Sequence, residues 1–464
     1  MLFNSFVFCG LFLPCVLLAF WMAGSDRWRR AILLGSSLLF YGYFHWPYLV
    51  LLASLVGVAW ACALWAERTD RSAPVWVAAG LLLGVLAYYK YGGFLETIAR
   101  DIGALDATSR RLHDVALPIG ISFIVFQALG YVVDVHRREF AAERRYSVVL
   151  LFKAFFPQLI AGPICRAHEL IPQIKGRFVF RPSQVLGGLG IFVVGLLLKE
   201  VFADGLAPLV DKLYGAGPRL AGGDAWAAAL GFGMQIYADF WAYSTMAVGL
   251  ARMFGVDIPV NFRLPYLATS LREFWRRWHI TLSQWLRDYL YKPLGGSRHG
   301  QRRTIFALMA TMLLGGLWHG ANYTFLIWGF IHGAAQVVEH LLRRGPRGAA
   351  EPSITDRVAG WVWTTVVVAV AWVFFRAPDV HTALDIVKTM FVGGAGVSMP
   401  NEVRQVAVLG AALFLLQLPI ERLLAALREE RVPAMAVGAL SVWCVAGAVV
   451  LGAPAAVPFI YFQF

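Results

Sequence analysis

Long apolar segments recur from residue 2 to residue 464, and they constrain the fold of this chain more than any other feature. A helix that crosses roughly 30 Å of hydrocarbon needs about 20 apolar residues, and about a dozen such windows, including broken ones, can be counted. Hydrophobic side chains make up 59% of the 464 residues and charged ones only 15%. This composition, with a mean hydropathy of +0.63, excludes an ordinary soluble protein. The sequence predicts an all-α, polytopic integral membrane protein with about 11–13 transmembrane or re-entrant helices.

The positive charges lie between the apolar segments rather than on one soluble face, so the net charge of +13 does not indicate a nucleic-acid partner. Short cytoplasmic loops carry an excess of lysine and arginine. We therefore expect the N-terminus outside, residues 27–30, 67–71 and 136–145 inside, and the breaks at 45–47 and 96–114 outside. This alternation predicts a multi-pass protein surrounded by membrane lipid.

The sequence shows no repeat, low-complexity tract or soluble domain boundary, so residues 1–464 are expected to form a single membrane-embedded domain. Lys153, Pro157 and the Gly162-Pro163 pair interrupt one apolar segment. Proline removes a backbone donor that hydrocarbon cannot replace, and this segment is therefore expected to be re-entrant or interior. The five cysteines have no metal-ligand spacing, and no metal is expected.

The basic, aromatic stretch from 271 to 291 is expected to form one amphipathic helix. At 100° per residue, one histidine falls within a stripe of basic and polar side chains. Such a helix can lie in the interface and face anionic lipid, or its stripe can line a cavity and bind a phosphate-bearing ligand, because guanidinium groups suit phosphate. The two interpretations are compatible. The stripe consists of Arg272, Arg276, His279, Ser283 and Arg287.

A second histidine, His319, lies in an apolar, glycine-bearing segment. Gly316 and Gly320 form a small-x-x-x-small pair that lets another helix approach closely. An ionisable residue at membrane depth marks a functional site by default, and the alternative is a neutral histidine bonded to a neighbouring helix. His332 would point away from His319 in a continuous helix, and it is interpreted as structural. Neighbours that spacing groups with His319 are Trp318, Asn322 and Tyr323.

Histidine suits acyl transfer, because a neutral imidazole with a pKa near 6.5 removes a proton from an attacking hydroxyl at neutral pH. A thioester such as acetyl-CoA is already activated, so one base and one oxyanion donor suffice. The sequence has no G-x-S-x-G, G-x-x-x-x-G-K-[ST] or H-E-x-x-H motif and no complete G-x-G-x-x-G. Redox, metal and nucleotide-hydrolysis chemistry therefore lack support.

Two segments carry a resemblance to a known family. FWRRWHITLSQWLRDYLY around His279 and GGLWHGANYTFLIWG around His319 resemble the membrane-bound O-acyltransferase family. The resemblance is to its bacterial branch, which acetylates alginate, cellulose and peptidoglycan. Further segments with this resemblance are 117–138, 155–166, 235–255, 372–377 and the FIYFQF tail.

The resemblance implies a membrane-bound O-acetyltransferase of the bacterial cell inner membrane. Its donor would be cytoplasmic acetyl-CoA, a substrate rather than a bound cofactor. The acetyl group would reach an exported or cell-envelope polysaccharide through a periplasmic SGNH-type partner or a polysaccharide synthase complex. His319 corresponds to the family's essential histidine, and His279 matches its second motif position.

One motif departs from the family pattern. Where relatives commonly read DFSGYSDMAIG, this chain keeps Asp239 and Tyr243 but carries Trp241 and Thr245. Asp239 and Tyr243 are expected to support the site. The competing interpretation is a polysaccharide or lipid-intermediate transporter with a histidine proton relay, which predicts inverted repeats that the sequence does not show.

Overall fold

The computed structural model describes residues 1–105, 115–217, 220–342, 353–394, 396–452 and 458–460. Within these residues, helices are the only regular secondary structure. The chain forms two compact units, each built from distant segments. Unit 1 comprises Met1–Val193, Tyr243–Pro259 and Leu427–Ser441, and unit 2 comprises Val194–Ala242, Val260–Ala426 and Val442–Phe464. These units are not independent domains in the sequence, because each combines distant segments, and the expectation of a single domain stays a prediction.

Seven helical segments in the described part of the chain are long and apolar enough to cross a membrane. Two shorter apolar helical segments, Val7–Met22 and Ile121–His136, add to them. The polytopic, all-helical class predicted from the sequence is thus confirmed. The seven segments are Pro47–Arg68, Ala73–Asp101, Pro182–Gly215, Tyr323–Leu342, Ile354–Arg376, Pro400–Arg428 and Ala434–Leu451.

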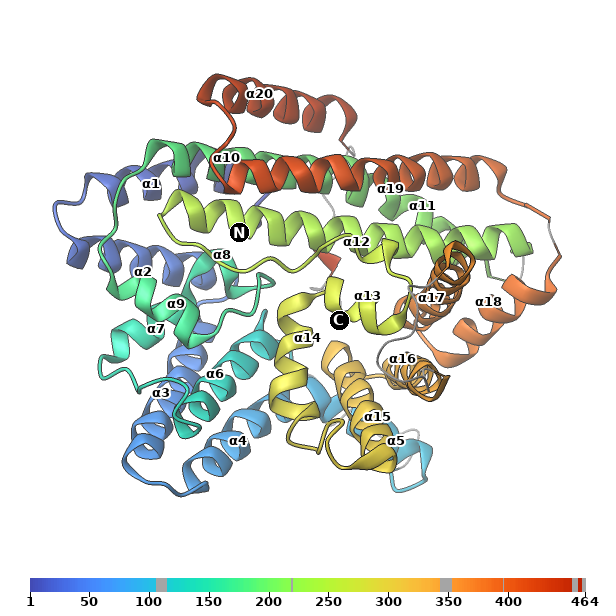
Figure 1. The fold of residues 1–464 in the computed structure, drawn as a ribbon, viewed down its shortest axis with the longest axis horizontal. Helices are drawn as coiled ribbons and strands as arrows, with labels where there is room; N and C mark the ends of the chain where they lie inside the picture. Colours follow the sequence, from blue (N-terminus) through green and yellow to red (C-terminus); the bar gives the residue numbers. More distant parts are fainter. Residues whose placement is uncertain (106–114, 218–219, 343–352, 395, 453–457, 461–464) are drawn as a thin grey trace. The chain divides into compact units, whose positions relative to one another are not determined.

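Unit 1 contains the N-terminal helices (Figure 1). Local sequence sets several of their ends: the Ser25 hydroxyl caps one helix by accepting from the Trp28 N–H, and Pro47 and Pro74 stand in the first turns of two others. The helices are α1 (Leu13–Met22), α2 (Asp26–Gly42), α3 (Pro47–Arg68), α4 (Ala73–Leu86), α5 (Gly92–Asp101), α6 (Ile121–His136), α7 (Tyr146–Ala154), α8 (Phe156–Leu159), α9 (Ala167–Lys175) and most of α10 (Pro182–Leu197), with π-helical turns at Val7–Phe12 and Ala87–Tyr91.

Loops of unit 1 that were predicted to share a side of the membrane contact one another. Arg138 donates to the Glu67 carbonyl at 2.7 Å and pairs with Asp70 at 2.6 Å, which joins two loops expected inside. On the side expected outside, the Tyr48 hydroxyl donates to the Ala116 carbonyl at 3.3 Å. Both contacts agree with the topology inferred from the basic residues.

The segment interrupted by Lys153 and Pro157 lies inside unit 1, as the sequence predicted. Every residue from Val148 to Cys165 is buried. The Lys153 ammonium lies 4.1 Å from the ring centroid of Phe152, a cation–π contact that partly compensates for its burial.

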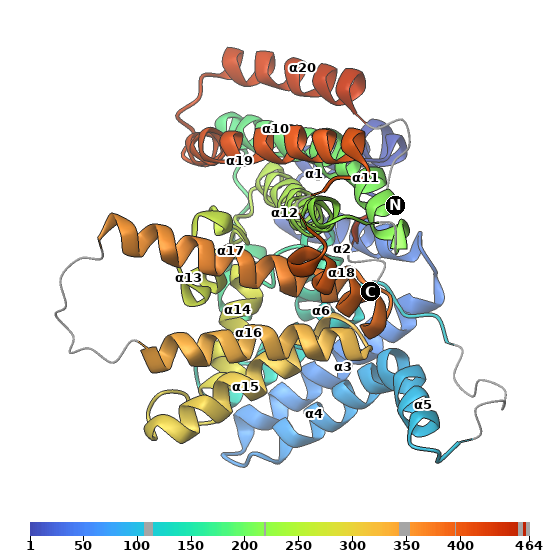
Figure 2. The same cartoon turned by 90° about the vertical axis from the view of Figure 1, so that its right-hand side faces the viewer.

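Unit 2 carries most of the remaining helices (Figures 1 and 2). Its longest helix, α12, crosses into unit 1 after Ala242. The helices are α11 (Asp204–Gly215), α12 (Gly222–Met253), α13 (Leu271–Arg277), α14 (Ile280–Leu286), α15 (Gly300–His319), α16 (Tyr323–Leu342), α17 (Ile354–Arg376), α18 (Val380–Val392), most of α19 (Pro400–Arg428) and the part of α20 (Ala434–Leu451) that follows Ser441, with π-helical turns at Leu198–Ala203 and Arg287–Tyr291 and a 3₁₀ turn at Pro265–Leu267.

Helices α15 and α16 form a tightly packed hairpin and lie side by side in both views (Figures 1 and 2). Glycines make the close approach possible. A Cβ added at Gly316 would lie 2.2 Å from the Phe325 carbonyl oxygen, and one at Gly329 would lie 2.4 Å from the Met312 oxygen. The prediction of a close helix neighbour at the Gly316–Gly320 pair is confirmed.

Candidate active site

His279 stands at a break in the stretch that was expected to be one helix. Helix α13 ends at Arg277 and α14 begins at Ile280, and His279 between them has the left-handed φ of 41° and ψ of 55°. A non-glycine residue held in this region costs on the order of 1–3 kcal/mol and persists only where its surroundings fix it. The continuous helix expected over 271–291 is therefore wrong.

Asn261 fixes this break through three hydrogen bonds. Its carbonyl accepts from the Ile280 N–H at 2.9 Å, and its Oδ1 accepts from the Thr281 N–H at 3.3 Å and from the Thr281 hydroxyl at 2.6 Å. Asn261 and Thr281 are buried, so these bonds are shielded from water. The backbone at His279 is thus held by side-chain and main-chain contacts from a distant segment.

The break separates His279 from the arginines of the expected stripe. His279 is completely buried, whereas Arg272, Arg276 and Arg287 are exposed. Arg287 forms two hydrogen bonds of 2.9 Å to Asp288. The structure therefore does not bring His279 and the three arginines onto one surface.

Ser283, the remaining member of the stripe, is bonded within its own turn. Its N–H donates to the His279 carbonyl at 2.9 Å, and its hydroxyl donates to the Trp278 carbonyl at 3.1 Å. Both bonds stabilise the start of α14 after the break.

Aromatic rings surround the His279 imidazole. Its centroid lies 4.6 Å from the Phe240 ring in an edge-to-face contact and 6.0 Å from Trp318. His279 lies outside the seven candidate spans. Burial lowers the pKa of His279 to about 3, so its imidazole is neutral at physiological pH.

His319 is the last residue of α15, and Gly320 ends that helix with an extended backbone of φ −158° and ψ 152°. The His319 side chain is buried among three aromatic rings. Centroid distances from its ring are 4.9 Å to Trp318, 5.0 Å to Trp328 and 5.2 Å to Phe375. Trp318 therefore contacts both His319 and His279.

A third buried histidine, His332, belongs to the same aromatic cluster. Its ring centroid lies 4.6 Å from Trp328, the residue that also contacts His319. The chain turns back between α15 and α16, so the two histidines are not on one continuous helix. Consequently, the geometry in which His332 would point away from His319 does not apply.

Asn322 holds the turn that follows His319. Its Nδ2 donates to the Pro378 carbonyl at 3.1 Å, and its Oδ1 accepts from the Thr324 N–H at 3.2 Å. Tyr323, the first residue of α16, is half-buried. The two residues thus lie at the α15–α16 turn, next to His319 in the chain.

Asp239 takes part in a buried ionic cluster that was not predicted. The Lys199 ammonium lies 2.6 Å from Asp204 and 2.8 Å from Asp239, and all three side chains are buried. Asp239 also accepts a 2.6 Å hydrogen bond from the Ile460 N–H. The sequence offered a signal, since each of the three charged residues interrupts an apolar segment.

The segment around Ile460 lies near His279. Phe459 contacts Phe240 with ring centroids 5.8 Å apart, and Phe240 in turn contacts His279 at 4.6 Å. The ionic cluster, through Asp239, therefore fixes the segment around Ile460 close to His279.

The two departures from the family motif have separate surroundings. Trp241 stacks on Tyr237, with centroids 5.1 Å apart and planes within 5°. Thr245 is buried. In unit 1, Tyr243 stacks on Phe3 at 4.7 Å.

In the part of the chain that the structure describes, no group of three or more histidine, cysteine, aspartate or glutamate side chains could hold a metal ion.

The described residues form a multi-pass helical protein with two buried histidines at helix ends. Comparison with known proteins identifies its kind. The chain belongs to MBOAT, the membrane-bound O-acyltransferase family, whose model matches residues 11–377. It is therefore a membrane-bound acyltransferase, and the transporter interpretation is set aside.

Two relatives match most of the chain, and a third matches about half of it. A probable alginate O-acetylase from Azotobacter vinelandii is 40% identical over 403 residues, which cover 85% of this chain and 79% of that protein. A peptidoglycan O-acetyltransferase from Helicobacter pylori is 34% identical over 433 residues, covering 86% and 81%. A teichoic acid D-alanyltransferase from Streptococcus thermophilus is 27% identical over 237 residues, covering 47% and 56%.

Proposed function

We propose that this acyltransferase takes an acetyl group from cytoplasmic acetyl-CoA and delivers it across the bacterial inner membrane for O-acetylation of an exported or cell-envelope polysaccharide. The names of the two relatives that cover most of the chain support acetyl as the transferred group and polysaccharide as the acceptor class. The observation that carries the proposed chemistry is Trp318, whose indole contacts both His279 and His319.

In this proposal His319 is the general base. Its neutral imidazole removes the proton from an acceptor hydroxyl while the hydroxyl oxygen attacks the thioester carbonyl carbon. The new C–O bond leaves a tetrahedral oxyanion, which collapses and breaks the C–S bond. The imidazolium then returns the proton to the departing thiolate, giving free CoA and the acetyl ester.

His279 supplies the oxyanion donor. Its imidazole is neutral, so one ring nitrogen carries an N–H that can donate a hydrogen bond to the developing charge. Trp318 keeps the two imidazoles in fixed orientations because its indole contacts both. Asn322 acts as a positioning residue, since its bonds to Pro378 and Thr324 fix the turn after His319.

The exposed Arg272 and Arg276 are proposed to meet the phosphates of acetyl-CoA on the cytoplasmic side. Changing either residue to glutamine should raise the KM for acetyl-CoA about threefold and leave kcat unchanged. Arg404→Gln, at an exposed position on α19, is the matched control. An unchanged KM in both stripe variants would assign these arginines to lipid contact instead.

Other candidate residues support this site. Asp239 binds the Ile460 N–H, Ser283 bonds to the backbone of the turn at His279, and Tyr323 begins the helix after His319. Arg287 is grouped with Arg272 and Arg276, and Tyr243 is proposed to position α12 within unit 1. On the far side of the membrane, an SGNH-type periplasmic partner or a polysaccharide synthase complex would receive the acetyl group. Acetyl-CoA and membrane lipid are the remaining partners.

The test is acetyl-CoA consumption by the purified protein in lipid nanodiscs, with alginate and peptidoglycan fragments as acceptors and the periplasmic partner added. We expect His319→Ala to abolish CoA release. The matched control is His381→Ala, because His381 is exposed on α18 and pairs with Asp385 at 3.2 Å. CoA release by His319→Ala at the rate of the control would overturn the role of His319. Transfer from a D-alanyl donor but not from acetyl-CoA would overturn acetyl as the group.

A further inference from the structure

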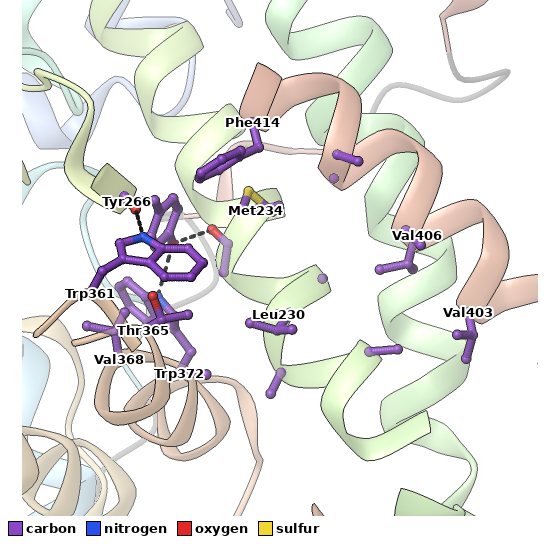
Figure 3. Close-up of a pocket in the computed structure, with 18 residues that line it drawn as sticks. Leu230, Met234, Tyr266, Trp361, Thr365, Val368, Trp372, Val403, Val406 and Phe414 are labelled. Carbon is purple, nitrogen blue, oxygen red and sulfur yellow. Dashed lines mark hydrogen bonds between the residues drawn. The ribbon is translucent and has the colours of Figure 1, made fainter. Parts of the chain in front are cut away.

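A cavity of about 460 Å³ lies within unit 2, between α12, α17 and α19 (Figure 3). Small residues create it. Gly231 and Gly233 on α12 and Gly410 and Ala411 on α19 are among its lining residues, and none of them has a side chain larger than a methyl group. The cavity is of the size that binds small ligands in other proteins, which is roughly 300–1,000 Å³.

The polar groups at the tryptophan side of this cavity bond to one another. The Tyr266 hydroxyl donates to the Gly233 carbonyl at 2.6 Å and accepts from Trp372 Nε1 at 3.1 Å. Trp361 Nε1 donates to the Tyr266 carbonyl at 2.9 Å, and Figure 3 shows these bonds at one end of the cavity. Since the indoles and the phenol are already bonded, the cavity offers its occupant mainly apolar contacts.

Two walls of the cavity, α17 and α19, are among the helices apolar and long enough to cross a membrane. In a membrane, hydrocarbon would surround helices of this length and composition. Arg357 is exposed one turn before Trp361, and residues four apart share a face of a helix. A cation thus stands on the same helix face as the cavity-lining Trp361, where a phosphate can meet it.

We propose that this cavity binds one acyl chain of an anionic membrane phospholipid, whose phosphate lies at Arg357. Apolar cavities stay free of water and take up apolar ligands, and a membrane supplies such chains at high concentration. The chain would contact Met234, Val368 and Phe414, which line the cavity.

The bound chain would support the wall behind both histidines. Trp372 lines the cavity, and its ring centroid lies 5.1 Å from Trp278 and 5.2 Å from Phe375. Trp278 precedes His279, and Phe375 contacts His319 at 5.2 Å. Loss of the chain would leave one face of Trp372 without contact, and packing defects of this kind loosen neighbouring side chains.

The test is photolabelling of the full-length protein in nanodiscs of phosphatidylglycerol that carries a diazirine in the middle of one acyl chain. We expect labelled peptides containing Met234 and Phe414. Ala411→Phe fills the cavity and should lower this labelling about threefold or more. Val408→Phe is the matched control, because Val408 is exposed on the same helix and does not line the cavity.

Equal labelling of these peptides in the two phenylalanine variants would overturn the proposal. If Ala411→Phe does not fold, competition decides: excess unlabelled phosphatidylglycerol must remove the labelling of Met234 in the unchanged protein, and persistence of the label contradicts a specific site. Arg357→Gln should lower the labelling, whereas Arg404→Gln should not. Unchanged labelling in Arg357→Gln would overturn the phospholipid assignment in favour of another hydrocarbon. This readout is binding, so it fails or succeeds independently of the proposed acetyl transfer.

Discussion

His279 and His319 each lie at the end of a helix and in similar surroundings, but different interactions fix their positions. Both histidines are buried, and both contact Trp318. At His279 the main chain is left-handed and is fixed by Asn261. At His319 the helix ends in a regular way, and aromatic rings enclose the side chain. One position is thus defined by backbone bonds and the other by side-chain packing.

Because of this difference, the two positions should respond differently to substitution. The backbone at His279 persists as long as the bonds from Asn261 remain, so the imidazole can change without loss of the break. The orientation of His319 depends on three neighbouring rings, so a change in any of them moves the imidazole. The following predictions test this contrast, beginning with the largest expected effect.

Replacing His319 should have the largest effect on rate. Removal of the proposed general base in His319→Gln, which keeps most of the side-chain volume, should lower CoA release by about 10²–10⁴-fold. Size-exclusion chromatography should still give a monodisperse protein. A loss of less than fivefold in a folded variant would contradict the assignment and would move the base to another residue.

Replacing His279 should separate its side chain from its backbone. Two variants are compared, His279→Asn and His279→Ala. Asparagine adopts the left-handed conformation more readily than alanine, so His279→Asn should be the more stable variant. We expect both to lose about 10–100-fold in rate, because both remove the imidazole. Equal thermal stability of the two variants would show that the positive φ does not limit the choice of residue. Full activity of His279→Asn would show that the amide replaces the imidazole as donor.

The packing that holds His319 should respond to a single methyl group. Gly316→Ala places a Cβ within 2.2 Å of the Phe325 carbonyl, so the α15–α16 hairpin must shift, and we expect a loss of about 1–3 kcal/mol in stability. Gly438→Ala is the matched control, because an added Cβ there meets nothing within 4 Å. The measurement is the melting temperature of each variant in the same detergent. Equal melting temperatures would contradict the close contact.

The smallest expected effect is on the pH dependence of stability. The pKa of His279 is about 3 in the folded protein and near 6.5 when unfolded. Between these values the unfolded chain binds a proton that the folded one does not, so His279 destabilises the fold as the pH falls below 6.5. The melting temperature of His279→Asn should therefore decline less between pH 7.5 and pH 5 than that of the unchanged protein. Parallel declines would mean that His279 is accessible to water.

Features that depend on nearby sequence were predicted well. The apolar segments predicted the membrane class, and Gly316 predicted the close helix pair. The break at His279 was missed because helical periodicity says nothing of Asn261, whose side chain reaches it from 18 positions earlier. The pairing of Lys199 with Asp239 was missed for the same reason. Each depends on a contact that only the folded chain creates.

The left-handed backbone at His279 also restricts how this position can change during evolution. Valine, isoleucine and threonine are branched at Cβ and strongly disfavour a φ of 41°, whereas glycine, asparagine and aspartate accept it. Aspartate would be buried as a charge among aromatic rings, which excludes it. Of the residue types that favour this conformation, histidine, asparagine and glycine remain, and only the first two carry a hydrogen-bond donor in the side chain. The backbone conformation thus limits which residue types can replace His279, independently of any requirement for activity.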